Sequence, residues 1–275
     1  MASEAQTAAG GHEFDAGAAH NVAAEIEHEA HSPIEQFEIQ PFLDIQIGGV
    51  DLSFTNSSLW MAIAVGCVYL LVMQGSRHGS MVPGRLQSVV ELLYDFVANL
   101  VQENVGREGR QYFPFFFTLF TFILFGNLLG MIPGSFTFTS HIIVTFTMAV
   151  FVVTGVTVVG IWRHGFRFFG RFAPGGVPWP VLPLLIPIEI LSYLIRPISL
   201  SVRLFVNMMA GHIMLKTFAG FVIALSSFQI LAGAAPLALT IALSGLELAI
   251  ACLQAYVFTV LSCIYLQECL EDPAH

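Results

Sequence analysis

Long apolar runs dominate this chain, and the longest covers residues 181–225. As one α-helix it would be roughly 68 Å long, more than twice the thickness of a bilayer core. Apolar residues make up 56% of the chain and charged residues only 11%, whereas soluble domains carry about 25% charged residues. We therefore expect an all-α integral membrane protein, in which 181–225 is either two spans or one steeply tilted helix.

The other segments complete a single membrane domain, expected at residues 57–275. The expected spans are 58–74, 113–132 and 141–162, with a last apolar helix at 237–267 after a break at 233–236. Residues 83–105 have apolar side chains at helical spacing and polar ones opposite, which predicts an interfacial amphipathic helix. Residues 1–56 contain no Lys or Arg and are rich in Ala, Glu and His, so we expect a solvated polar tail.

A stripe of polar side chains follows one face of the segment 181–225. At about 100° per residue its members fall within roughly 40° of Arg203: Glu189, Ser192, Arg196, Ser199, Arg203 and Asn207. The stripe keeps its phase across Pro197, which favours one kinked helix over two spans. A guanidinium at bilayer depth costs roughly 2.5–3.5 kcal/mol on insertion scales. The stripe therefore indicates a path or contact for charge, with a structural role for Arg196 equally open.

His212 and Glu247 are the titratable residues expected to act together. His212 lies about 180° from Arg203 on its helix, and an intramembrane Glu needs a partner or a proton. If the helices of 181–225 and 237–267 pack antiparallel, the two side chains can meet and pass a proton, because histidine titrates in the physiological range.

Two amides extend this set of candidates. Gln254 lies one heptad beyond Glu247 and could line the same path, whereas Asn127 fits a helix–helix hydrogen bond as well as a channel role. The sequence has no GxxxxGK[ST] phosphate loop, no nucleophile elbow and no His/Cys metal cluster. We therefore expect no enzymatic activity from the isolated chain, no metal and no cofactor.

The distribution of basic residues predicts the orientation. Arginines follow the first and third spans, and cytoplasmic loops carry an excess of Lys and Arg; these residues are Arg77, Arg85, Arg107, Arg110, Arg163, Arg167 and Arg171. Both loops should be inside and the tail 1–56 outside. Five crossings put the C-terminus inside, whereas two crossings by 181–225 would put it outside.

Residues 197–212, PISLSVRLFVNMMAGH, resemble the signature of subunit a of the F-type ATP synthase. The resemblance extends over nearly the whole chain from the first span, through GNLLGMIP at 126–133, PIE at 187–189 and LELAIACLQAYVF at 246–258. It implies a hairpin of two long tilted helices against a rotating ring of c subunits, with two offset aqueous half-channels. It also implies peripheral-stalk b subunits, the rest of the complex and membrane lipids as partners, no nucleic acid, and the bacterial inner membrane rather than the mitochondrial one.

The resemblance also assigns roles to single residues. It makes Arg203 the essential arginine that faces the ring carboxylates. It places Asn207, His212, Glu247 and Gln254 on the outer half-channel, and Glu189, Ser192 and Ser199 on the inner one. Some bacterial members have an acid in place of His212 and a histidine in place of Glu247, and this chain has the swapped arrangement of mitochondrial and alphaproteobacterial members. Gly130 stands where some relatives have an acid.

Two other functions compete with proton translocation in an ATP synthase. A proton-coupled secondary transporter would have a midplane substrate site and, commonly, paired repeats with broken helices. The sequence shows no such repeat, and its polar residues form a stripe rather than a pocket. A non-conducting scaffold of a respiratory complex is the other alternative. The transported ion is expected to be the proton, with Na⁺ left open by this chain.

Overall fold

The computed structural model describes residues 41–43, 46–47, 50–51, 53–77, 84–132, 135–165, 168, 170, 180–226 and 230–270. Most of the predicted tail lies outside this part of the chain, as do Arg167 and Arg171. The helices are α2 (Asn56–Ser76), α3 (Arg85–Val105), α4 (Phe113–Gly130), α5 (Ile142–His164), α6 (Leu182–Ser226) and α7 (Ile230–Leu270), with 3-10 turns η2 (Gly106–Tyr112) and η3 (Phe138–Ser140). Among the described residues, five helical segments are long and apolar enough to cross a membrane. The expected all-α membrane fold is confirmed.

Short strands precede α2 in the described part of the chain. β1 (Pro41–Leu43) pairs antiparallel with β4 (Phe54–Thr55), and β2 (Gln46–Ile47) pairs antiparallel with β3 (Val50–Asp51). Apolar and polar residues alternate around these strands, a pattern of period two that is typical of extended chain. The chain then enters α2, whose N-terminus is capped by the Thr55 hydroxyl accepting from the backbone N–H of Ser58.

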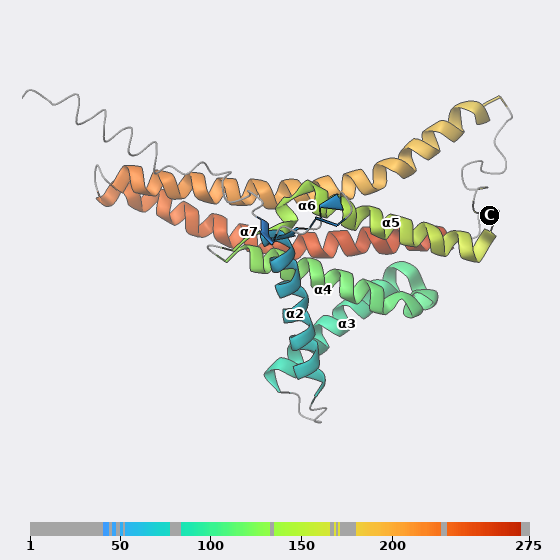
Figure 1. Ribbon diagram of the computed structural model, residues 1–275, viewed down its shortest axis with the longest axis horizontal. Coiled ribbons are helices and arrows are strands. Elements are labelled where there is room, and N and C mark those ends of the chain that lie inside the picture. The colour runs from blue at the N-terminus through green and yellow to red at the C-terminus, as the bar shows by residue number, and fades with distance from the viewer. Residues whose placement is uncertain are drawn as a thin grey trace, which may run out of the picture. The chain divides into compact units, whose positions relative to one another are not determined.

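The segment 181–225 is one helix, as the phase of the polar stripe predicted. α6 contains both Pro187 and Pro197, and Figure 1 shows its N-terminal part bending away from α7. Proline removes one backbone hydrogen bond and kinks a helix, but a membrane helix tolerates it where neighbours satisfy the freed groups. The predicted break at 233–236 was wrong, because α7 begins at Ile230 and continues through Pro236.

The apolar core lies where α3, α4, α5, α6 and α7 meet. α4 contributes Phe116 and Ile123, and α6 contributes Leu204 and Met208, all of them fully buried. α3 turns its buried side, which includes Val97, to this core. α6 and α7 pack side by side along much of their length, apart from the N-terminal part of α6 (Figure 1). The core therefore fixes how the polar residues of these two helices face each other.

Candidate functional site

Among the described residues, polar contacts at three levels along the helices join α6 to α7. They are Arg196 Nη1 with Glu268 Oε2, Asn207 Nδ2 donating to Gln254 Oε1 at 2.9 Å, and His212 Nδ1 at 3.5 Å from Glu247 Oε1. As the residue number rises along α6, it falls along α7, so the two helices are antiparallel. The condition on which His212 and Glu247 were expected to meet is therefore fulfilled.

The His212–Glu247 contact lies inside the protein. Glu247 is 4% exposed, and its carboxylate approaches the backbone of Gly211 so closely that a β-carbon there would lie 2.8 Å from Oε1. Within the described part of the chain, neither Glu247 oxygen has a hydrogen-bond partner, and His212 is its ionic neighbour. A carboxyl group in such a place needs a counter-charge or a proton. The geometry suits an acid–base pair that shares a proton.

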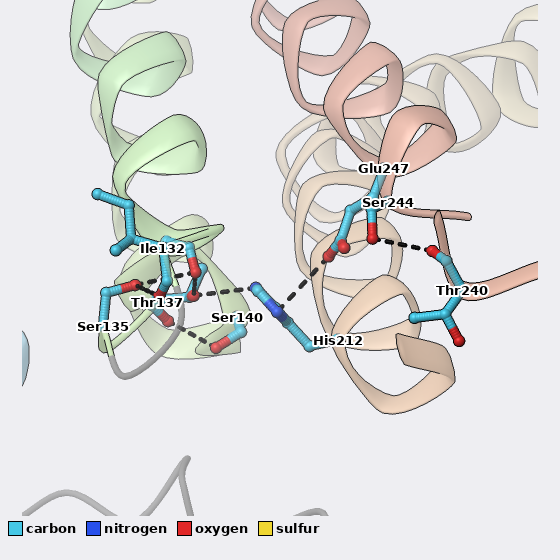
Figure 2. A network of polar contacts seen from close by, with 9 residues as sticks. Ile132, Ser135, Thr137, Ser140, His212, Thr240, Ser244 and Glu247 are labelled. Atoms are coloured by element: carbon cyan, nitrogen blue, oxygen red, sulfur yellow. Dashed lines mark hydrogen bonds and ion pairs between the residues drawn. The ribbon is translucent and has the colours of Figure 1, made fainter. Parts of the chain in front are cut away.

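The other ring nitrogen of His212 has a partner that sequence reasoning missed. Nε2 of His212 lies 2.9 Å from the hydroxyl of Thr137, in the segment between α4 and α5. Figure 2 shows the histidine ring between Thr137 on one side and Glu247 on the other. Thr137 is 75 positions from His212 along the chain, and no periodicity or spacing in the sequence connects them.

Buried amides continue the polar path beyond Asn207. Gln254 and Asn127 are 1% and 0% exposed, and Asn127 Nδ2 donates to the carbonyl of Ala251 at 3.2 Å. The structure thus shows the helix–helix hydrogen bond for Asn127. Within the described residues, Asn127 Oδ1 and Gln254 Nε2 have no protein partner. Buried polar atoms of this kind are sites where water is commonly bound.

Arg203 lies on a face of α6 that the described part of the chain leaves open. Its side chain is exposed, like those of Ser192 and Ser199 in the same stripe. Among the described residues its guanidinium makes no hydrogen bond or ion pair, and the Tyr265 hydroxyl lies within its electrostatic reach. Glu189 is partly buried on the same helix. The stripe therefore presents a cation to the outside of the fold, away from the His212–Glu247 contact.

Arg196 makes contacts of the kind that a structural role requires. It forms an ion pair with Glu268, and its guanidinium carbon lies 5.2 Å from the ring centre of Tyr193 and 5.0 Å from that of Tyr265. Cation–π contacts of this length are stabilising. Glu268 was missed by the sequence reasoning, although an antiparallel register through His212 and Glu247 places Arg196 opposite the end of α7.

Comparison with known proteins gives a consistent result. The family described as ATP synthase A chain matches residues 57–267. The chain is 54% identical over 240 residues to ATP synthase subunit a of Rhodospirillum rubrum. The aligned residues cover 87% of this chain and 98% of that relative. The protein of the same name from Parvibaculum lavamentivorans is 52% identical over 246 residues, or 88% of this chain and 94% of the relative. ATP synthase subunit a of Chelativorans is 53% identical over 250 residues, which make up 90% of this chain and 100% of that relative.

Proposed function

Since the chain belongs to the ATP synthase A chain family, we propose that it is the proton-translocating stator subunit of an F-type ATP synthase membrane sector. In this role it forms two offset half-channels against a ring of c subunits and couples proton flow to rotation and ATP synthesis. Peripheral-stalk b subunits hold it in place. The complex lies in a bacterial inner membrane, with the N-terminus outside and the C-terminus in the cytoplasm.

The observation that carries this proposal is the exposed guanidinium of Arg203. A cation on the lipid-facing side of a membrane helix is costly, and within the described residues nothing pairs with it. A partner that brings a carboxylate to this face removes the cost, because opposite charges at short range stabilise each other. The ring of c subunits is the partner that the family implies.

The chemistry of arginine explains how rotation is coupled to proton flow. A guanidinium cannot release its proton in a protein, so Arg203 does not conduct protons itself. It favours the ionised form of an opposing carboxyl group, so a protonated ring carboxyl that arrives from one half-channel gives up its proton there. After passing Arg203 it is reprotonated from the other half-channel and returns to lipid as a neutral group. One charge that crosses 100 mV releases about 2.3 kcal/mol, so several protons serve each ATP.

Two sets of residues supply the half-channels in this proposal. His212 and Glu247, with Asn207 and Gln254, form the outer path, and their cross-helix contacts support a connected polar route. Asn127 adds a buried amide beside it. The inner path uses the partly buried Glu189 and the exposed Ser192 and Ser199 of the α6 stripe. Because Arg203 stands between the two sets, it also blocks a direct leak of protons.

The test replaces Arg203 by alanine in the assembled complex. Arg203→Ala should abolish ATP synthesis driven by a proton gradient while the ATPase head and the ring still copurify with the chain. Arg203→Lys should restore little activity, since lysine lacks the planar fork and can lose its proton when buried. Arg163→Ala is the matched control, because its ion pair with Glu108 at 2.8 Å is exposed and such pairs contribute about 0–1 kcal/mol.

Two results would argue against the proposal. Near-normal coupled synthesis by Arg203→Ala would remove the role of the guanidinium. Purification of the chain as a lone substrate-binding protomer, without an ATPase head or a ring, would favour the secondary transporter instead.

A further inference from the structure

The segment that carries Thr137 lies in a groove on α4 formed by two glycines. A β-carbon at Gly126 would lie 2.4 Å from Cζ of Phe138, and one at Gly130 would lie 2.6 Å from Cγ2 and Oγ1 of Thr137. Neither position has room for a side chain. Phe138 is 1% exposed and belongs to a small core with Ala64 of α2. The side chains of Thr137 and Phe138 are therefore held against the helix surface.

Hydrogen bonds fix Thr137 within this groove. Its hydroxyl donates to the carbonyl of Gly130 at 3.0 Å, and its own carbonyl accepts from the Ser140 hydroxyl at 2.6 Å. The same hydroxyl oxygen lies 2.9 Å from Nε2 of His212 (Figure 2). Thr137 thus joins a rigid element to one edge of the imidazole ring.

The contact between Thr137 and His212 determines which ring nitrogen of the histidine carries the proton. A hydroxyl group has one proton, and that of Thr137 goes to the Gly130 carbonyl. The contact with His212 then requires that Nε2 carries a proton and donates it to the hydroxyl oxygen. In a neutral imidazole this leaves Nδ1 unprotonated, and Nδ1 is the nitrogen that lies 3.5 Å from Glu247 Oε1. The base therefore points at the acid.

We propose that Thr137 is a positioning residue that holds His212 in the tautomer able to take a proton from Glu247. This inference rests on the function proposed above and deepens its outer half-channel. In the transfer, the O–H bond of the Glu247 carboxyl breaks and an N–H bond forms at Nδ1, which gives a carboxylate and an imidazolium. Nε2–H keeps its bond to Thr137 in both states, so the ring does not turn. The reverse step restores the starting state.

Other titratable and charged groups lie around His212, and a change at Thr137 alone does not alter them. Glu247 faces it from α7, and Lys216 lies one turn further along α6 within electrostatic reach. The segment of Thr137 contributes one more titratable residue, His141, whose ring packs against Phe136 at 4.9 Å. A substitution that removes only the Thr137 hydroxyl leaves all of these in place.

The experiment compares two threonines of the same segment. Thr137→Val removes the hydroxyl that contacts His212. Thr139→Val is the control, because the Thr139 hydroxyl is 0% exposed and has no partner within the described residues. ATP-driven proton pumping by the complete ATP synthase is measured in inverted membrane vesicles over a range of pH.

The Thr137→Val complex should pump roughly tenfold more slowly, the effect of one net hydrogen bond lost in a limiting transfer. Its pH profile should move to lower pH, because the imidazolium loses the acceptor of its Nε2–H. Thr137→Ser should recover most of the rate, and Thr139→Val should match the unmodified complex. If Thr137→Val does not assemble, Thr137→Ala, which is smaller, replaces it in the same comparison.

Three outcomes separate this inference from the proposed function. The tautomer role would be overturned if Thr137→Val and Thr139→Val gave the same pumping rate and the same pH profile. This holds whether both variants match the unmodified complex or both lose activity to the same extent. If Arg203→Ala still abolishes coupled synthesis in either case, the proposed function stands. If Arg203→Ala pumps and synthesises normally, the proposed function itself fails.

Discussion

Gly211 decides how closely the acid of α7 approaches the base of α6, and Gly211→Ala tests this. The new β-carbon would lie 2.8 Å from Oε1 and 3.1 Å from Cδ of Glu247. Ordinary contact begins at 3.4 Å, so the carboxylate must move by about 0.6 Å, the difference between the two distances. Displacements of this order near reacting groups reduce rates by up to about a hundredfold. We expect proton flux to fall about tenfold.

Stability should change much less than proton flux. Alanine gains about 1 kcal/mol over glycine inside a helix, whereas overpacking costs roughly 1–3 kcal/mol. The difference leaves a net loss of stability of about 0–2 kcal/mol. We expect the lower part of this range, because the displaced atoms are the flexible end of a side chain. The control is Gly220→Ala on the same helix, where a β-carbon meets nothing within 4 Å.

The assay is ATP-driven proton pumping in vesicles, normalised to the amount of assembled complex. A second variant identifies the cause: Gly211→Ala combined with Glu247→Asp shortens the acid by one methylene and should recover part of the flux. If Gly211→Ala pumps as fast as Gly220→Ala, the reasoning that ties flux to the His212–Glu247 distance is refuted.

Three further predictions follow from the same structure and sequence. Cysteines introduced at Ala18 and Ala274 should be labelled from opposite sides of sealed vesicles, and labelling from the same side would refute an odd number of crossings. Removing either His212 or Glu247 should slow proton uptake more than it harms assembly, and exchanging the two residues should retain part of the activity; unchanged flux in a His212→Ala, Glu247→Gln double variant would contradict the relay. Gly126→Ala should destabilise the chain by roughly 1–3 kcal/mol, since the new carbon would lie 2.4 Å from a buried aromatic ring, and a thermal unfolding midpoint equal to that of Gly220→Ala would disprove this.

The continuity of α6 was predictable because its evidence is local. Polar residues from Glu189 to Asn207 stay on one face at 100° per residue, and a break at Pro197 would have had no reason to preserve that phase. The start of α7 was not predictable in the same way. Pro236 looked like a boundary, since proline disrupts helices, but helix packing and membrane surroundings override that local preference.

The site was only partly predictable, because contacts between distant segments depend on packing. His212 and Glu247 stood out as titratable groups in apolar surroundings, but their meeting required an antiparallel register that the sequence could not supply. Thr137 gave no signal at all. Its position depends on the groove at Gly126 and Gly130, and a glycine selected for close approach cannot be distinguished in one sequence from any other glycine.

The register of α6 against α7 explains why the His212–Glu247 pair lies apart from Arg203. Three polar contacts, at Arg196, Asn207 and His212, hold α6 to α7. Side-chain packing and polar contacts both hold membrane helices together, and here the polar contacts add to the register that the apolar core fixes. A slip of one helical turn would break all three contacts at once. In the same register Arg196 and Asn207 of the stripe contact α7, whereas Arg203 between them remains exposed to a partner and the His212–Glu247 pair stays enclosed.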